Sequence, residues 1–131
     1  MSNDRKTRIL LVDDEYDISL TFKIGLEESG FIVDSFNDPL LALTHFKPGI
    51  YNLLLLDIKM PKMDGFELCK QLKKIDGKVK VCFITAFDIR KGDTKAASTM
   101  LDNDDDNDDK HIIQKPILID DLAIQVKAEL S

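Results

Sequence analysis

The sequence contains no apolar stretch that approaches the roughly 20 residues that a helix needs to cross a membrane. Its longest apolar runs, Leu53–Leu56 among them, are long enough only for strands. The first residues, Met1–Arg8, are polar in character and lack the apolar core of a secretory signal. We therefore predict a cytoplasmic protein that makes no membrane contact.

Cysteine is scarce as well, because Cys69 and Cys82 are the only two in 131 residues. They do not form a C-x-x-C pair, and no histidine stands at zinc-ligand spacing from them. We interpret both as small buried hydrophobic residues of a reducing compartment, without a disulfide. His45 and His111 have no partners at motif spacing, and we interpret them as structural or surface groups and not as metal ligands.

The sequence also lacks the basic excess of a nucleic-acid-binding surface, because its net charge is −6. The acidity is local. The segment 102–109 (DNDDDNDD) holds six aspartates, and the rest of the chain has 18 acidic and 18 basic residues. Asn107 and Ile113 stand where a calcium-binding loop needs glycine and glutamate. We favour a solvated acidic insert, with a weak cation site or a recognition tail as the alternative.

Apolar runs that alternate with amphipathic stretches are the main pattern that is present. The expected strands are 8–12, 31–36, 51–56, 79–84 and 111–114. The expected helices are 16–29, 88–101 and 117–130, with two more that begin at the capping residues Asp38 and Asp64. This alternation predicts an α/β fold with one doubly wound sheet of five parallel strands and five helices, in a single domain over 1–131.

The apolar faces of the expected helices should cover this sheet. In the first helix they include Ile24 and Leu26, and in the second they include Leu40 and Leu41. The third strand, 51–56, lacks polar alternation, which is typical of parallel strands that are buried on both faces.

Polar residues follow four of the five expected strands. Asp13 and Asp14 end the first strand, Asp57 the third, Thr85 the fourth and Lys115 the fifth. In the strand order 2-1-3-4-5, which we take as a working assumption, strands one and three are neighbours about 4.8 Å apart. Asp14 and Asp57 can then share one Mg²⁺. With a hydroxyl and an ammonium group nearby, the set suits phosphoryl transfer to a carboxylate.

A specific motif follows the third strand, the tract 57–65 (DIKMPKMDG). The pairs Asp13-Asp14, Thr85-Ala86 and Lys115-Pro116 accompany it in the same order along the chain. On these residues the chain resembles a response-regulator receiver domain of two-component signalling, over about residues 7–130. The resemblance implies a flavodoxin-like, CheY-like fold.

The resemblance also implies a metal-dependent phosphorylation site. Asp57 would be the phosphoacceptor, and a sensor histidine kinase or a phosphotransfer protein would supply the phosphoryl group. Asp14, Asp57 and the backbone carbonyl of Lys59 would bind Mg²⁺ or Mn²⁺ directly, and Asp13 would hold the ion through water.

Four further positions have roles in the family. Thr85 and Lys115 would contact the phosphoryl group, and the small Ala86 would leave the site open. The bond between Lys115 and Pro116 would be cis.

In function, the resemblance implies a switch that catalyses only its own phosphoryl transfer and autodephosphorylation. Phosphorylation would change its conformation and control an output through a downstream protein or an effector domain outside this sequence, with a phosphorylation-dependent homodimer as a possible form. The sequence leaves open the cognate kinase, the output and whether the chain stands alone or belongs to a longer regulator.

Two departures from the family concern the switch. The acidic insert 102–109 occupies the region where a Gly-Ala pair is usual, and Ile112 stands where the family has tyrosine or phenylalanine. We hypothesise that the switch works through Thr85 and the loop after strand four, with Phe87 or the insert replacing the aromatic residue.

Three rival interpretations meet obstacles in the sequence. An aspartate-nucleophile phosphatase or mutase needs an Asp-x-Asp motif after the first strand, where this sequence has Asp13-Asp14-Glu15. It also needs a cap domain, which does not fit in 131 residues. A flavodoxin-like cofactor binder needs a phosphate-cradling loop after strand one, where the acidic tract 13–15 would repel a phosphate. A degenerate receiver that binds partners without phosphorylation is disfavoured by the complete site set, although Ile112 keeps it open.

Overall fold

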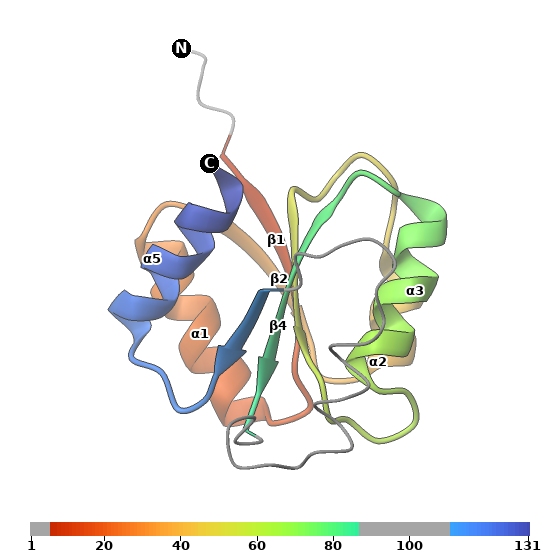
Figure 1. Ribbon diagram of the computed structural model, residues 1–131, viewed down its shortest axis with the longest axis horizontal. Coiled ribbons are helices and arrows are strands. Elements are labelled where there is room, and N and C mark those ends of the chain that lie inside the picture. Colours follow the sequence, from red (N-terminus) through yellow and green to blue (C-terminus); the bar gives the residue numbers. More distant parts are fainter. Residues whose placement is uncertain (1–5, 87–110) are drawn as a thin grey trace.

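The structure is a computed structural model that describes residues 6–86 and 111–131 (Figure 1). The described residues form five parallel strands in one sheet, in the order β2-β1-β3-β4-β5. The strands are β1 (Arg8–Val12), β2 (Ile32–Phe36), β3 (Leu53–Asp57), β4 (Lys80–Thr85) and β5 (His111–Gln114). The predicted strand order is therefore confirmed.

Helices cover both faces of this sheet. They are α1 (Tyr16–Glu28), α2 (Pro39–His45), α3 (Gly65–Ile75) and α5 (Ile119–Leu130). Figure 1 shows α1 and α5 on one side of the sheet and α2 and α3 on the other, which is the predicted doubly wound arrangement. The helix expected over 88–101 and the acidic insert lie outside the described residues. None of the described helices combines the length and apolar character that a membrane crossing needs.

The core is divided into two layers by the sheet. Ile9 and Leu11 of β1 belong to the cluster under α1 and α5, whereas Leu10 and Val12 belong to the cluster under α2 and α3. β3 alternates in the same way, and every one of its residues is buried. Burial on both faces explains why the β3 sequence shows no polar alternation.

Capping side chains begin two of the helices, as predicted. The Asp38 carboxylate accepts a hydrogen bond from the Leu40 N–H at 2.8 Å, and the Asp64 carboxylate accepts one from the Glu67 N–H at 2.9 Å. Each cap satisfies one backbone donor that has no partner inside its helix. Asp64 thereby sets the start of α3 directly after the tract that follows Asp57.

The predicted apolar faces of α1 and α2 are partly wrong. Leu26 is fully buried, but Ile24, Leu40 and Leu41 are large exposed side chains. In α2 the buried residues are Pro39 and the small Ala42. Packing against neighbouring elements sets the rotation of each helix about its axis. An apolar residue just outside the face that packs against the sheet therefore remains in solvent.

Candidate functional site

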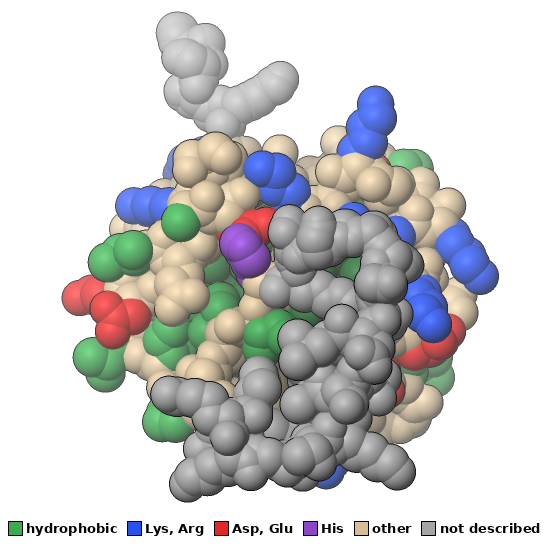
Figure 2. Space-filling view, viewed as in Figure 1, with side chains coloured by type: hydrophobic (Ala, Val, Ile, Leu, Met, Phe, Trp, Pro, Cys, Tyr) green, Lys and Arg blue, Asp and Glu red, His purple; other side chains and the backbone are tan. Residues whose placement is uncertain are grey.

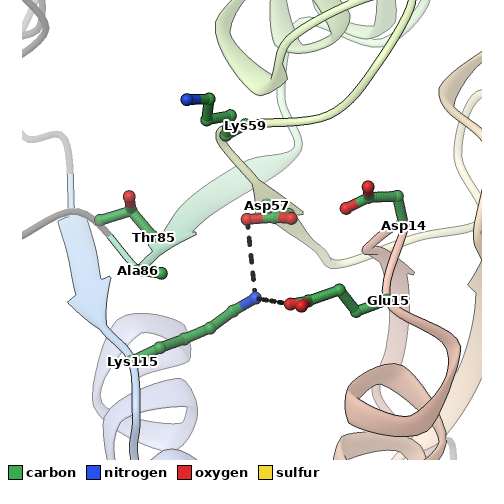
Figure 3. Close-up of a pocket in the computed structure, with 7 residues that line it drawn as sticks. All are labelled: Asp14, Glu15, Asp57, Lys59, Thr85, Ala86 and Lys115. Atoms are coloured by element: carbon green, nitrogen blue, oxygen red, sulfur yellow. Dashed lines mark hydrogen bonds and ion pairs between the residues drawn. The ribbon is translucent and has the colours of Figure 1, made fainter.

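A pocket lies beyond the carboxyl ends of the strands, where the sequence places its polar residues. Figure 3 shows the residues that line it. They are Asp14, Glu15, Asp57, Lys59, Thr85, Ala86 and Lys115. They come from the ends of β1, β3, β4 and β5 and from the loops that follow, so the sheet edge assembles the pocket from segments distant in the sequence.

The loop after β3 holds Asp57 in place through close backbone packing. The Gly65 N–H donates a hydrogen bond to the Ile58 carbonyl oxygen at 2.8 Å, which turns the start of α3 back onto the end of β3. A Cβ atom at Gly65 would lie 2.4 Å from the carbonyl oxygen of Asp57. Only glycine permits this approach, and this gives a physical reason for the last residue of the tract 57–65.

Three carboxylates meet in the pocket. Asp13, Asp14 and Asp57 each offer an oxygen atom within 4.8 Å of the others, and Asp13 and Asp57 are buried. One oxygen of Asp13, Oδ1, accepts a hydrogen bond from the Glu15 N–H, and the buried Oδ2 forms an ion pair with Lys115. An all-oxygen set with two buried carboxylates fits a hard divalent cation, because Mg²⁺ takes oxygen ligands and combines carboxylates with water.

Lys115 supplies the positive charge that faces these carboxylates. Its Nζ lies 3.1 Å from Asp13 Oδ2. It also lies 3.2 Å from Glu15 Oε1 and 3.8 Å from Asp57 Oδ1, the two contacts drawn in Figure 3. Burial alone would lower the pKa of Lys115, but the carboxylates of Asp13 and Asp57 outweigh it and raise the pKa. The side chain is 8% exposed and charged, so it partly neutralises the pocket.

The environment of Asp57 disfavours its ionised form. Burial contributes most, followed by the Asp13 charge, and the Asp14 carboxyl adds to them; together they raise the pKa of Asp57 to about 7 against the opposing charge of Lys115. A divalent cation among these carboxylates would reverse the balance by stabilising the ionised form.

The raised pKa of Asp57 predicts a stability change that depends on pH and metal. Between the ordinary value near 4 and the raised value near 7, the unfolded chain has released the proton and the folded chain retains it, so stability falls as pH rises. Without metal at about pH 8, we expect Asp57→Asn to increase the free energy of unfolding by about 1–3 kcal/mol. Urea unfolding with a chelator, at about pH 5 and about pH 8, measures this difference.

Magnesium should reduce the stability difference between Asp57→Asn and wild type, because the ion binds the wild-type carboxylate and stabilises the wild-type fold. Asp64→Asn is the matched control, because it exchanges an aspartate for a capping asparagine outside the pocket. A metal-free Asp57→Asn protein that is less stable than wild type at about pH 8 would contradict the electrostatic account.

Thr85 and Ala86 end β4 at the mouth of the pocket. Thr85 is buried, and its carbonyl oxygen accepts hydrogen bonds from the Lys115 N–H at 2.8 Å and from Gln114 Nε2 at 3.2 Å. These bonds join the end of β4 to the end of β5. The Lys115–Pro116 peptide bond that follows is cis, as expected.

Two other predicted positions have different surroundings. Ile112 is half buried and packs against the core cluster under α2 and α3, where it lies opposite Phe83 in the strand register. Lys59 lines the pocket, but in Figure 3 its side chain points away from Asp57. Phe87, which the switch hypothesis invokes, lies outside the described residues.

Glu15 is a pocket residue that sequence reasoning did not select. Its carboxylate forms an ion pair with Lys115 across 100 residues of sequence, as Figure 3 shows. The only signal in the sequence was its position directly after the acidic pair. That position alone could not distinguish a pocket residue from a solvated carboxylate at the start of α1.

Comparison with known proteins decides the family. The model of the response regulator receiver domain family matches residues 9–127. The chain belongs to this family. The response regulator receiver protein CpdR of Brucella abortus is 32% identical over 123 residues, which cover 94% of this chain and 96% of CpdR. Against several longer relatives the chain spans about half of their length; one is the response regulator ArlR of Staphylococcus saprophyticus, with 31% identity and 52% of its length covered.

Solved structures agree with this assignment. A CheY-like receiver domain from Methanospirillum hungatei superposes with a TM-score of 0.80 at 28% identity, covering 96% of this chain and 94% of that one. The response regulator TrrA from Thermotoga maritima, solved in complex with Mg²⁺ and BeF, has a TM-score of 0.73 and 30% identity, covering 95% and 99%. The flavodoxin-like fold of this receiver domain is therefore shown. Membership of a signalling family favours the switch over the phosphatase and cofactor-binding alternatives.

Proposed function

We propose that this receiver domain takes a phosphoryl group onto Asp57 from a phosphohistidine of a sensor histidine kinase or a phosphotransfer protein, with Mg²⁺ or Mn²⁺ bound beside it. The observation that carries the proposal is the meeting of three carboxylates and one buried lysine at a single sheet edge. In this proposal the domain is a switch and not an enzyme that acts on other substrates.

The chain's own residues divide the chemistry between them. An Asp57 oxygen attacks the phosphorus in line with the leaving group, forming the acyl phosphate as the bond to the donor nitrogen breaks. Asp13, Asp14, Asp57 and the Lys59 carbonyl would hold the cation, which would neutralise charge on the phosphoryl oxygens. The Lys115 ammonium, 3.8 Å from Asp57, would stabilise the same oxygens.

The product changes the charge of the pocket. An acyl phosphate adds about two negative charges beside Lys115, which is already shared among three carboxylates. We propose that Lys115 then moves from Glu15 toward the phosphoryl group and that Thr85 donates its hydroxyl to it. Movement at Thr85 would pass to β5 through the hydrogen bonds that join the two strand ends.

Partners of the phosphorylated form are part of the same proposal. Figure 2 shows exposed hydrophobic side chains over α5, whereas Lys and Arg side chains gather on the side of α3. Leu118 and Ile124 are among the large exposed apolar residues of the α5 region. We propose a cytoplasmic role with a protein partner or effector domain, with self-association as one possible output and without direct contact to nucleic acid or membrane.

Labelling with a small phosphodonor tests the proposal. Wild-type protein with Mg²⁺ should become labelled, whereas Asp57→Asn should lose the label completely because the amide is not a nucleophile for this transfer. Chelation of the metal should also abolish labelling of wild type. Asp64→Asn is the control for a general loss of carboxylates and should label normally.

Two results would contradict the proposal. One is label retained by Asp57→Asn, which would place the acceptor elsewhere. The other is a wild-type protein that is folded and loaded with Mg²⁺ but takes up no label, which would favour a receiver that binds partners without phosphorylation.

A further inference from the structure

A second group of metal-binding side chains lies away from the phosphorylation pocket. Cys82 of β4, His111 at the start of β5 and Glu129 in the last turn of α5 each offer a ligand atom within 4.8 Å of the others. Cys82 stands three residues before Thr85, which separates the group from the pocket by about 10 Å along the strand. Nothing in the proposed phosphorylation chemistry uses these three side chains.

The strand register brings the group together. Cys82 and His111 are direct partners in the parallel pairing of β4 with β5, so their side chains leave the sheet on the same face. Cys82 belongs to the core cluster under α1 and α5, and α5 packs across β4 on that face. The helix thereby places Glu129 over the two strands, where its carboxylate forms an ion pair with His111 Nδ1.

A further contact holds the end of α5 against β4. The Lys80 ammonium donates a hydrogen bond to the Glu129 carbonyl oxygen at 3.1 Å. This bond fixes the backbone of Glu129 above the strand that carries Cys82. The Glu129 carboxylate near Cys82 therefore belongs to an ordered helix end and not to a frayed one.

The three ligand residues differ in how far they are exposed to solvent. Cys82 is 1% exposed, the Glu129 side chain is 15% exposed and the His111 side chain is 53% exposed. The sulfur is therefore the most deeply buried of the three ligands and the imidazole the most exposed. Burial, with the Glu129 charge adding to it, raises the pKa of Cys82 to about 12, and an incoming cation has to displace the thiol proton.

We propose that Cys82, His111 and Glu129 form a binding site for one borderline-soft divalent cation, with Zn²⁺ as the ion that best matches the set. Thiolate, imidazole and carboxylate are the three ligand types that zinc uses, whereas Mg²⁺ selects oxygen ligands in an octahedron. The two sites of the chain therefore select different ions. Three protein ligands leave the fourth tetrahedral position for water.

The side chains need only a small adjustment to bind the ion. Ligand atoms around a tetrahedral zinc lie about 3.5 Å apart, and the three atoms already lie within 4.8 Å of one another. Glu129 and His111 are in direct contact, so their ligand atoms must separate to admit the ion between them. His111 is exposed and Glu129 stands near the end of its helix, so both can rotate toward the fixed sulfur. The bound ion would take the place of the ion pair between them and tie α5 to β4 and β5.

Cobalt is the probe for this site, because Co²⁺ adopts zinc-like geometry and gives a thiolate charge-transfer band when cysteine binds it. The full chain is titrated with Co²⁺ in the presence of excess Mg²⁺, which occupies the acidic pocket. Wild type should show the charge-transfer band and tetrahedral visible bands, and one equivalent of Zn²⁺ should remove them. A cation held by the acidic insert or by the pocket gives no sulfur band.

The chain provides a matched control for each soft ligand, because it has one further cysteine and one further histidine. Cys82→Ala should abolish the band, and His111→Ala should weaken Zn²⁺ binding by at least about tenfold. Cys69→Ala and His45→Ala should leave the charge-transfer band and the Zn²⁺ affinity unchanged. Because Cys82 is buried and its loss can affect folding, the exposed His111 gives the independent test.

Several outcomes would overturn the site. They are a wild-type chain without a charge-transfer band at saturating Co²⁺, a band that Cys69→Ala removes, and an affinity that His111→Ala leaves unchanged. In each case His111 and Glu129 form an ordinary ion pair beside a buried thiol. The band should survive in Asp57→Asn, so the outcome is separate from the phosphorylation proposal.

Discussion

Gly65→Ala is expected to destabilise the fold by about 3 kcal/mol and to reduce phosphoryl labelling of Asp57. The reason is geometric: the added Cβ would lie 2.4 Å from the carbonyl oxygen of Asp57 and 3.0 Å from the Cα of Ile58. Both obstacles are backbone, which cannot rotate away as a flexible side chain can. Relief requires moving α3 away from β3 or shifting Asp57, and either change alters the pocket.

A second glycine in the same region serves as the control for Gly65→Ala. At Gly77 an added Cβ would meet only the Lys73 carbonyl oxygen, at an ordinary distance of 3.7 Å. We expect Gly77→Ala to be neutral or to stabilise by about 0.4–1 kcal/mol, since it restricts the unfolded chain without strain. Urea unfolding and phosphodonor labelling of both variants measure the contrast. Equal effects at the two glycines would rule out the steric explanation.

Lys115→Met is expected to destabilise the metal-free protein by about 3 kcal/mol at about pH 8. Methionine keeps much of the stem but removes the charge that lies 3.1 Å from Asp13, 3.2 Å from Glu15 and 3.8 Å from Asp57. Asp13 and Asp57 are buried, so their charges would remain without the nearby ammonium. The loss of stability caused by Lys115→Met should be smaller at about pH 5, because Asp57 then holds a proton in the folded state.

Added Mg²⁺ should also reduce the cost of Lys115→Met, since the ion supplies positive charge to the same carboxylates. Lys23→Met is the control, because Lys23 lies on α1 away from the pocket, where it pairs with Glu27 and donates a hydrogen bond to the Val33 carbonyl oxygen. Loss of these two partly exposed contacts should cost about 1 kcal/mol of folding stability. In an Asp57→Asn background the effect of Lys115→Met should be smaller than in wild type. A cost that is the same with and without Mg²⁺, and at both pH values, would show that packing and not charge explains Lys115.

The two proposed sites lie on different parts of the sheet. The pocket with Asp57 collects oxygen ligands and a lysine at the carboxyl ends of the strands, whereas the group with Cys82 collects sulfur, nitrogen and oxygen on the α5 face. Both involve β4 and β5, whose ends are joined by the hydrogen bonds to the Thr85 carbonyl oxygen. A cation bound to Cys82 would therefore restrain the strands through which the pocket is proposed to signal.

Much of the fold and of the pocket could be predicted from local sequence alone. The apolar runs such as Leu53–Leu56 identify buried strands, and capping residues such as Asp38 and Asp64 identify helix starts, because both signals depend on neighbours in the chain. Parallel strands present their carboxyl ends at one edge, so the polar residues after those runs were predicted to meet. For Asp57 and Lys115 this prediction is confirmed by their ion pair.

Only the tertiary structure decided which distant side chains meet. Helix rotation left Ile24 in solvent, the reach of Lys115 brought Glu15 into the pocket, and strand register placed Cys82 beside His111 under Glu129. These results depend on packing between elements, and no local pattern encodes the relative rotation and register of two elements. The sequence by itself thus determined the kind of each element and the edge where the chemistry lies. The packing of α5 against β4 and β5 created the second group of ligands.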